Sequence, residues 1–165
     1  MIAMLAALTL AATVIAQATP APVPEKMPFY IPYGAPIGIE MAQKAAQAAA
    51  AEAKRHDWKL AIAVVSPSGD LTYFWKMDDT QLASITIAQK KAFTAATFRR
   101  ESEVFFNQME SGHPYVGTLD PRLVASPGGI PIVVDGKLIG AIGCSGGAGS
   151  QDAVACRAGA AAVSR

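Results

Sequence analysis

The sequence GCSGG at residues 143–147 matches the G-x-S-x-G pattern with which many hydrolases present a nucleophilic serine between a strand and a helix. Such a serine needs a histidine as its base, and in hydrolases with this pattern the histidine follows the serine along the chain. The chain has two histidines, His56 and His113, and both precede Ser145. We therefore interpret the match as accidental, and the glycines need another explanation.

The same glycines predict a turn that can bind an anion. A glycine-rich turn just before a helix leaves backbone N–H groups unpaired at the positive end of the helix dipole, and Ser145, Gly146 and Gly147 occupy such a position. Lys91 and Thr94 share one face of an earlier predicted helix and would add a cation and a hydroxyl group. Two simpler interpretations stay open: the glycines serve only to reverse the chain, and Lys91 is a solvated lysine of an amphipathic helix.

Helices and hairpins that alternate along the chain must position these residues. Short apolar runs predict strands over residues 60–66 and 71–76, and two further strands flank Asp135-Gly136, which suits a two-residue type I′ turn because both positions need a positive φ. Strands joined by such short turns are antiparallel. Helices are predicted from Pro36 to His56 and from Ser102 to Met109. Another helix would begin after a cap at Asp78, Asp79 or Thr80 and end at Phe98. A last helix would begin at Ser150, which would cap it. This order predicts an α+β fold in which helices cover an antiparallel sheet.

The N-terminal segment predicts export to the periplasm or the medium. Residues 1–18 carry no charged side chain and end in Ala16-Gln17-Ala18, the small-x-small site of a secretory signal peptide. The stretch is shorter than the roughly 20 apolar residues of a membrane span, so no stable span is expected in the mature chain. Residues 19–35 contain five prolines and predict an extended, poorly packed lead-in. Residues 36–165 then form one domain.

Composition narrows the choice of partners and of redox chemistry. The chain has 14 Lys and Arg against 13 Asp and Glu, and this balance without a basic cluster argues against nucleic acid as a partner. The two cysteines, Cys144 and Cys156, could pair in an oxidising compartment. Because unpaired cysteine is among the most buried residue types, we favour two small core residues over a bridge.

Three stretches of the sequence resemble one protein family. The most specific is GGIPIVVDGKLIGAIGCSGGAGSQD, residues 128–152, which resembles the second hairpin of the GlcG/HbpS family, also called the heme-degrading domain family. LAIAVVSPSGDLTYFWKMDD, residues 60–79, resembles the first hairpin of that family, and AQKKAFTAATF, residues 88–98, resembles its helix. The sequence departs from the family pattern at Cys144, where valine is usual.

This resemblance implies a profilin-like α/β sandwich in which helices flank a five-stranded antiparallel sheet, usually assembled as a homo-oligomer. It also implies an exported member that binds heme, or a related tetrapyrrole, without a covalent bond. An accessory protein or enzyme that binds a small carboxylate such as glycolate is the alternative. We favour a binding protein over an enzyme and assign no catalytic residue.

Under this resemblance His113 becomes the candidate iron ligand. It lies in residues 111–125, whose glycines and prolines predict a long loop, and loops of that length are often functional. Histidine is a usual axial ligand of heme iron, and the chain has no C-x-x-C-H motif for covalent attachment. Lys91, Thr94 and the turn at 145–147 would receive a heme propionate or the carboxylate of a small acid. An exposed loop histidine without a role is the alternative for His113.

Overall fold

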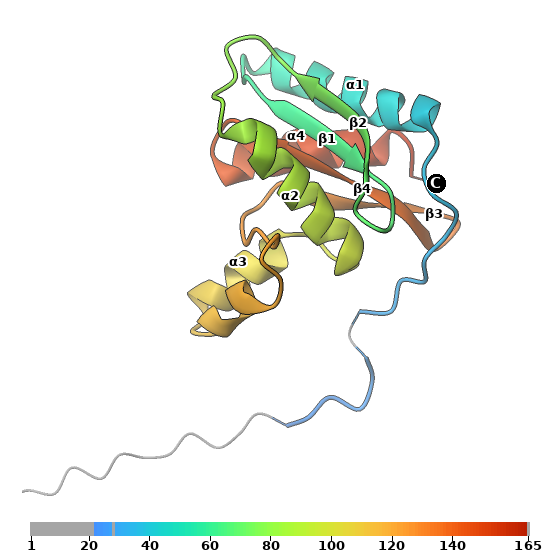
Figure 1. Cartoon of the computed structure of the whole chain (residues 1–165), viewed down its shortest axis with the longest axis vertical. Helices are drawn as coiled ribbons and strands as arrows, with labels where there is room; N and C mark the ends of the chain where they lie inside the picture. Colours follow the sequence, from blue (N-terminus) through green and yellow to red (C-terminus); the bar gives the residue numbers. More distant parts are fainter. Residues whose placement is uncertain (1–21, 28, 165) are drawn as a thin grey trace, which may run out of the picture.

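The computed structural model describes residues 22–27 and 29–164 (Figure 1). The signal peptide expected over residues 1–18 lies outside the described residues. No helix in the described part of the chain is both long enough and apolar enough to cross a membrane.

The four strands of the described chain form one antiparallel sheet in the order β2-β1-β4-β3. They are β1 (Ala61–Val65), β2 (Leu71–Lys76), β3 (Gly129–Val134) and β4 (Lys137–Ser145). Both predicted hairpins are confirmed, and Asp135 and Gly136 have φ angles of 49° and 71°, as their turn requires. The implied fifth strand is wrong for the described residues. The stretch before β3 is rich in proline and glycine, which disfavour a strand, and it forms helical turns instead.

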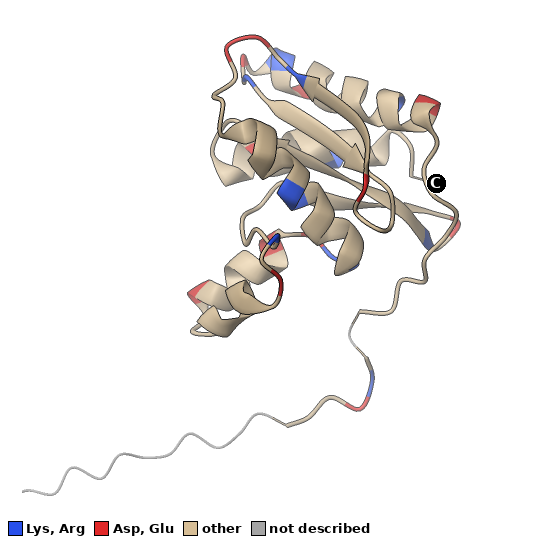
Figure 2. Ribbon diagram, in the orientation of Figure 1, with Lys and Arg blue, Asp and Glu red and all other residues tan. Residues whose placement is uncertain are grey.

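Helices cover both faces of this sheet, which confirms the α+β class (Figure 1). α1 (Ile39–Arg55) and α4 (Gly149–Ala161) pack on one face, and α2 (Ser84–Thr97) packs on the other. Successive strand residues point to opposite faces, so Ile62 and Val64 join the core under α1 and α4, whereas Ala61 and Ala63 join the core under α2. Burial on both faces explains the unbroken apolar sequence of β1, and Figure 2 shows charged residues mainly on helices and loops.

The contact between α2 and the sheet is close because both surfaces consist of small residues. Ala88, Ala92 and Ala95 of α2 are fully buried. A Cβ atom at Gly143 of β4 would collide with the carbonyl oxygen of Ala88. Glycine at position 143 therefore lets the helix backbone lie directly on the strand.

The predicted caps of two helices are wrong. Asp79 takes a positive φ of 60°, and the chain makes a further turn before α2 begins at Ser84. Ser150 lies inside the first turn of α4, where Gln151 Oε1 accepts a hydrogen bond of 2.8 Å from the N–H group of Ala148. The periodicity located both helices, but their first residues depend on the turns that lead into them.

A disulfide joins Cys144 at the end of β4 to Cys156 in α4, so our interpretation of two unpaired core cysteines was wrong. α4 folds back over the strand that precedes it, and this brings the two Cα atoms to 5.7 Å, within the range that a disulfide spans. Both residues are fully buried.

The last part of the lead-in, which was predicted to be poorly packed, contacts the domain. The N–H group of Gly34 donates to the carbonyl oxygen of Leu138 at 2.8 Å, and the Tyr33 hydroxyl donates to the carbonyl oxygen of Thr97 at 2.9 Å. The guanidinium of Arg100 lies 3.6 Å from the centre of the Phe29 ring, a cation–π contact. Residues 29–34 therefore form a strap between the end of α2 and β4.

A helical segment connects α2 to β3. It consists of α3 (Glu103–Glu110), which confirms the helix predicted there, and the short 3₁₀ helix η1 (Pro114–Thr118) within the stretch predicted as a loop. Figure 1 shows this segment below the sheet, at a distance from the two-sided core.

Candidate functional site

At the glycine turn, where the sequence predicts an anion site, the N–H group of Gly147 binds a side chain of the protein itself. Asp152, in the first turn of α4, accepts a hydrogen bond of 3.1 Å from the N–H group of Gly147 through Oδ1 and forms an ion pair of 2.8 Å with Lys91 Nζ through Oδ2. Lys91 is 1% exposed and Asp152 is 2% exposed. The interpretation of Lys91 as a solvated lysine is therefore wrong. The turn and Lys91 meet as predicted, around an internal carboxylate instead of a ligand.

The electrostatics of this site follow from its burial. Burial raises the pKa of the Asp152 carboxyl, whereas the Lys91 ammonium and the N–H groups of Gly147 and Gly146 act in the opposite direction. The space around the pair is tight, since a Cβ atom at Gly128 would lie 2.8 Å from the Cβ atom of Asp152. The arrangement is suited to holding α2, α4 and the turn together.

The hydroxyl groups of Ser145 and Thr94, which were predicted to line the ligand site, also have partners within the protein. Ser145 Oγ, which is buried, donates to Ser84 Oγ at 3.1 Å. Thr94 Oγ1 donates to the carbonyl oxygen of Lys90 at 2.8 Å and accepts from the N–H group of Val124 at 3.0 Å. With Ser145 bonded to another serine, the structure gives no support to a serine nucleophile.

Unlike the buried side chains of Lys91 and Ser145, His113 is exposed, and it lies at the start of η1. Its Nδ1 lies 3.3 Å from Ser111 Oγ, and that hydroxyl donates to the carbonyl oxygen of Gln108 at 3.0 Å. In the tautomer that carries its proton on Nδ1, the neutral imidazole donates to this hydroxyl. Nε2 then carries the lone pair with which histidine binds a metal ion. The structure thus leaves His113 suited to ligation and separates it from Lys91 and the glycine turn.

Apolar side chains are exposed on the same segment. α3 and η1 pack against each other, since a Cβ atom at Gly117 would lie 3.8 Å from Met109 Sδ. The exposed side chains of this segment and of the residue just after it, which we call together the α3–η1 surface, are Phe106, Met109, His113, Tyr115 and Leu119. Sequence reasoning did not single out Phe106 or Leu119, because a single sequence does not show which apolar side chains the core leaves uncovered.

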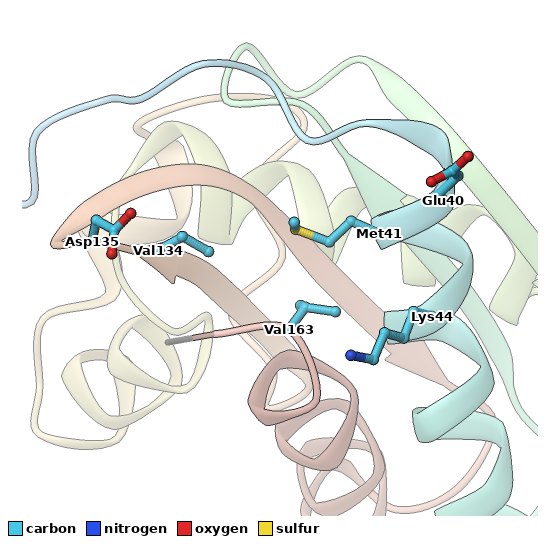
Figure 3. Close-up of a pocket in the computed structure, with 6 residues that line it drawn as sticks. All are labelled: Glu40, Met41, Lys44, Val134, Asp135 and Val163. Carbon is cyan, nitrogen blue, oxygen red and sulfur yellow. The ribbon is translucent and has the colours of Figure 1, made fainter.

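A pocket of about 580 Å³ lies elsewhere, between α1, the β3–β4 hairpin and the C-terminal residues. Its lining consists of Glu40, Met41, Lys44, Val134, Asp135 and Val163. Figure 3 shows Met41 and Lys44 extending from α1 toward the valines, with Asp135 at the opposite side. Its walls come from three distant segments, so no local motif pointed to it. No group of three or more metal-ligating side chains occurs among the described residues.

Comparison with known proteins identifies the family. The family model described as "Haem degrading protein HbpS-like" matches residues 37–161. The chain belongs to the HbpS-like family. Protein GlcG of Escherichia coli K12 is 39% identical over 94 residues, which are 57% of this chain and 69% of GlcG. The corrinoid adenosyltransferase PduO of Salmonella typhimurium LT2 is 32% identical over 96 residues, which are only 29% of PduO.

Solved structures of the family agree with this fold. HbpS is 27% identical with a TM-score of 0.74, over 80% of this chain and 93% of HbpS. PduOC, solved as a complex with heme, is 27% identical with a TM-score of 0.72, over 77% of this chain and 94% of PduOC. The Klebsiella pneumoniae protein ORFY, at 20% identity and a TM-score of 0.75, shares the fold. The family resemblance read from the sequence is confirmed.

Proposed function

We propose that the protein binds heme, or a related tetrapyrrole, without a covalent bond. The observation that carries this proposal is its membership of the HbpS-like family together with its likeness to PduOC, a protein of the same fold solved as a heme complex. Heme, when bound, supplies an iron centre whose chemistry depends on its axial ligand and on the polarity of its surroundings.

The α3–η1 surface has residues that suit heme. His113 would offer Nε2 to the iron in the tautomer whose Nδ1 donates to Ser111 Oγ, which lies 3.3 Å away. Tyr115 and Met109 would lie against the porphyrin and keep water from one face of it, and both are exposed. The Tyr115 ring meets the imidazole nearly edge-on, at an angle of 75° and a centroid distance of 6.2 Å, which helps to orient the histidine.

The test is a hemin titration of the mature protein, followed through the Soret band. Wild-type protein should give a saturable shift, and His113→Ala should change the position of the band and weaken binding. His56→Ala is the matched control, because His56 is held by Glu52 at 3.1 Å and by stacking on Trp58. Absence of a saturable shift in the wild type would contradict the proposal. A normal shift in His113→Ala would assign the iron to another ligand.

Export to the periplasm or the medium is part of the proposal. The Cys144–Cys156 disulfide supports it, because such bonds form and persist in oxidising compartments and are rare in the cytosol. Fractionation of cells that express the full chain should find the processed protein outside the cytoplasm. Recovery of unprocessed chain with reduced cysteines from the cytoplasm would contradict it.

A small carboxylate remains the alternative ligand, at a different place from the one predicted. Asp152 fills the position next to Lys91, so the candidate cation is now Lys44 at the 580 Å³ pocket. Stabilisation of the wild type by glycolate, lost in Lys44→Ala and absent with hemin, would favour this alternative. Equal unfolding temperatures with and without glycolate would exclude it.

A further inference from the structure

Arg100, between α2 and α3, carries a positive charge that forms no ion pair with the described residues. The two acidic residues that follow it, Glu101 and Glu103, both pair with Arg157, at 2.6 and 2.5 Å. The Nε atom of Arg100 is buried and has no hydrogen-bond partner in the same part of the chain. Buried polar groups nearly always have a partner, so this nitrogen calls for an explanation.

Aromatic rings surround this guanidinium where a carboxylate is usual. Its central carbon lies 3.6 Å from the centre of the Phe29 ring and 4.5 Å from the centre of the Phe105 ring, which belongs to α3. A ring face attracts a cation but gives the N–H group at Nε no strong acceptor. Burial lowers the pKa of Arg100, because the charged form is less well solvated here. Arginine nevertheless stays charged in proteins, so the position keeps a cation that an anion can pair with.

Phe29 is the part of the strap that can leave with the smallest loss of contacts. Neither Phe29 nor Tyr30 makes a backbone hydrogen bond with the described residues. The bonds that hold the strap begin at Ile31, whose carbonyl oxygen accepts from Arg99 at 3.3 Å. Segments with few buried contacts open locally at a small cost in free energy. Phe29 can therefore separate from Arg100 while the rest of the strap stays bound.

We propose that Arg100 binds a propionate carboxylate of the tetrapyrrole, and that Phe29 covers this arginine in the ligand-free protein. This inference rests on the proposed function, because it names the residue that receives the acid groups of that ligand. Heme carries its two propionates at one edge of the ring, away from the iron. Arg100 precedes α3 and His113 follows it, and the eight residues of this helix span about 12 Å. The iron and the carboxylates would thus meet different ends of the α3–η1 surface.

A carboxylate is a better partner for this arginine than a phenyl ring. It accepts charge-assisted hydrogen bonds from a guanidinium, often two in parallel, whereas the ring offers only the attraction of its face. A carboxylate that binds along the edge of the guanidinium would give Nε of Arg100 the acceptor that Phe29 does not supply. Release of Phe29 is then the structural consequence of binding.

Esterified hemin tests the carboxylate contact separately from the iron. Wild-type protein should bind hemin roughly tenfold more tightly than hemin dimethyl ester, which keeps the iron but has no free carboxylate. Arg100→Ala should bind both with equal affinity in the same Soret titration, and Arg100→Lys should retain part of the preference. Arg55→Ala is the matched control, because it removes a positive charge from α1 whose side chain is 68% exposed. It should retain the whole preference.

The outcomes separate this inference from the proposed function. Equal affinity of the wild type for hemin and for its ester would overturn the role of Arg100 and leave heme binding in place. A preference for hemin that persists in Arg100→Ala would overturn it as well, because another residue would then receive the carboxylates. No binding of either compound by the wild type would overturn both proposals.

Variants of the strap test the cover. Phe29→Ala should tighten hemin binding by about threefold, because the carboxylate no longer competes with the ring. Tyr30→Ala is the matched control and should leave the affinity unchanged, since this side chain is 80% exposed. Saturating hemin should also speed cleavage of the wild-type strap by chymotrypsin, which cuts after aromatic residues. Unchanged or weaker binding by Phe29→Ala, or protection of the strap by hemin, would overturn the exchange of Phe29 for a propionate.

Discussion

Removing the Cys144–Cys156 disulfide should destabilise the protein by an amount that can be worked out from the structure. The bond joins residues 12 positions apart and encloses the glycine turn and the start of α4. A cross-link that closes a loop of about 13 residues reduces the entropy of the unfolded chain by about 10 cal/mol/K, equivalent to about 3 kcal/mol at 25 °C. A loss of that size is a large part of the stability of a typical domain.

The perturbation is the double variant Cys144→Ala/Cys156→Ala. Alanine is chosen over serine because both positions are fully buried and a serine hydroxyl would be left without a partner. Thermal unfolding followed by circular dichroism should show a fall in Tm of roughly 10 °C for a domain of this size. Urea unfolding should give the corresponding loss of free energy of about 3 kcal/mol.

Reducing agent provides the control for this experiment. It should lower the Tm of the wild type by a similar amount and leave the Tm of the double variant unchanged, since that variant has no bond to reduce. A loss below about 1 kcal/mol in the double variant would refute the reasoning, because the loop-closure effect would then be far smaller than expected. Packing alone would in that case hold α4 on the sheet.

Three further predictions concern the buried ion pair, the tight turn and the strap. Lys91→Met should cost about 3 kcal/mol in urea unfolding at pH 7, because the Asp152 carboxylate loses its counter-charge. Burial raises the pKa of Asp152, so this deficit should shrink as the pH falls through the raised pKa and the carboxyl takes up a proton; a constant deficit would contradict the assignment. Gly128→Ala should destabilise the fold by more than about 2 kcal/mol, since its φ is 118° and a Cβ atom would touch Asp152. Gly136→Ala, where φ is 71° and the space is open, should cost only about 1 kcal/mol. Equal losses would contradict a steric role for Gly128. Arg100→Ala should speed limited proteolysis within residues 22–34 and cost no more than about 1 kcal/mol, and unchanged cleavage would mean that the arginine does not hold the strap.

Most of the fold could be predicted from local sequence. The positive φ angles of Asp135 and Gly136 follow from their residue types, and the apolar run of β1 predicted a strand. The first residues of α2 and α4 could not be predicted from the capping residue types, because the turns before these helices decide where each helix begins. The implied fifth strand was wrong for the described residues, since a resemblance transfers the topology of a family but not the local turns of one chain.

The candidate site was predicted in part. The turn at residues 145–147 and Lys91 do come together, but the carboxylate between them belongs to Asp152, which is 61 residues from Lys91 along the chain. The sequence places both residues on helices, but their distance depends on how α2 and α4 pack against opposite faces of the sheet. The position of His113 was easier to predict, because its exposure depends on local glycines and prolines.

The sequence by itself determined which segments become strands, hairpins and helices, because periodicity and turn chemistry act between residues that are close in the chain. Tertiary structure decided which charged, hydroxyl and thiol groups meet. Lys91 with Asp152, Cys144 with Cys156, and Ser145 with Ser84 are pairs formed when helices pack on the sheet. A buried polar group needs a partner within the protein, and Lys91 and Ser145, which were predicted to bind a ligand, therefore bond to other side chains in the core.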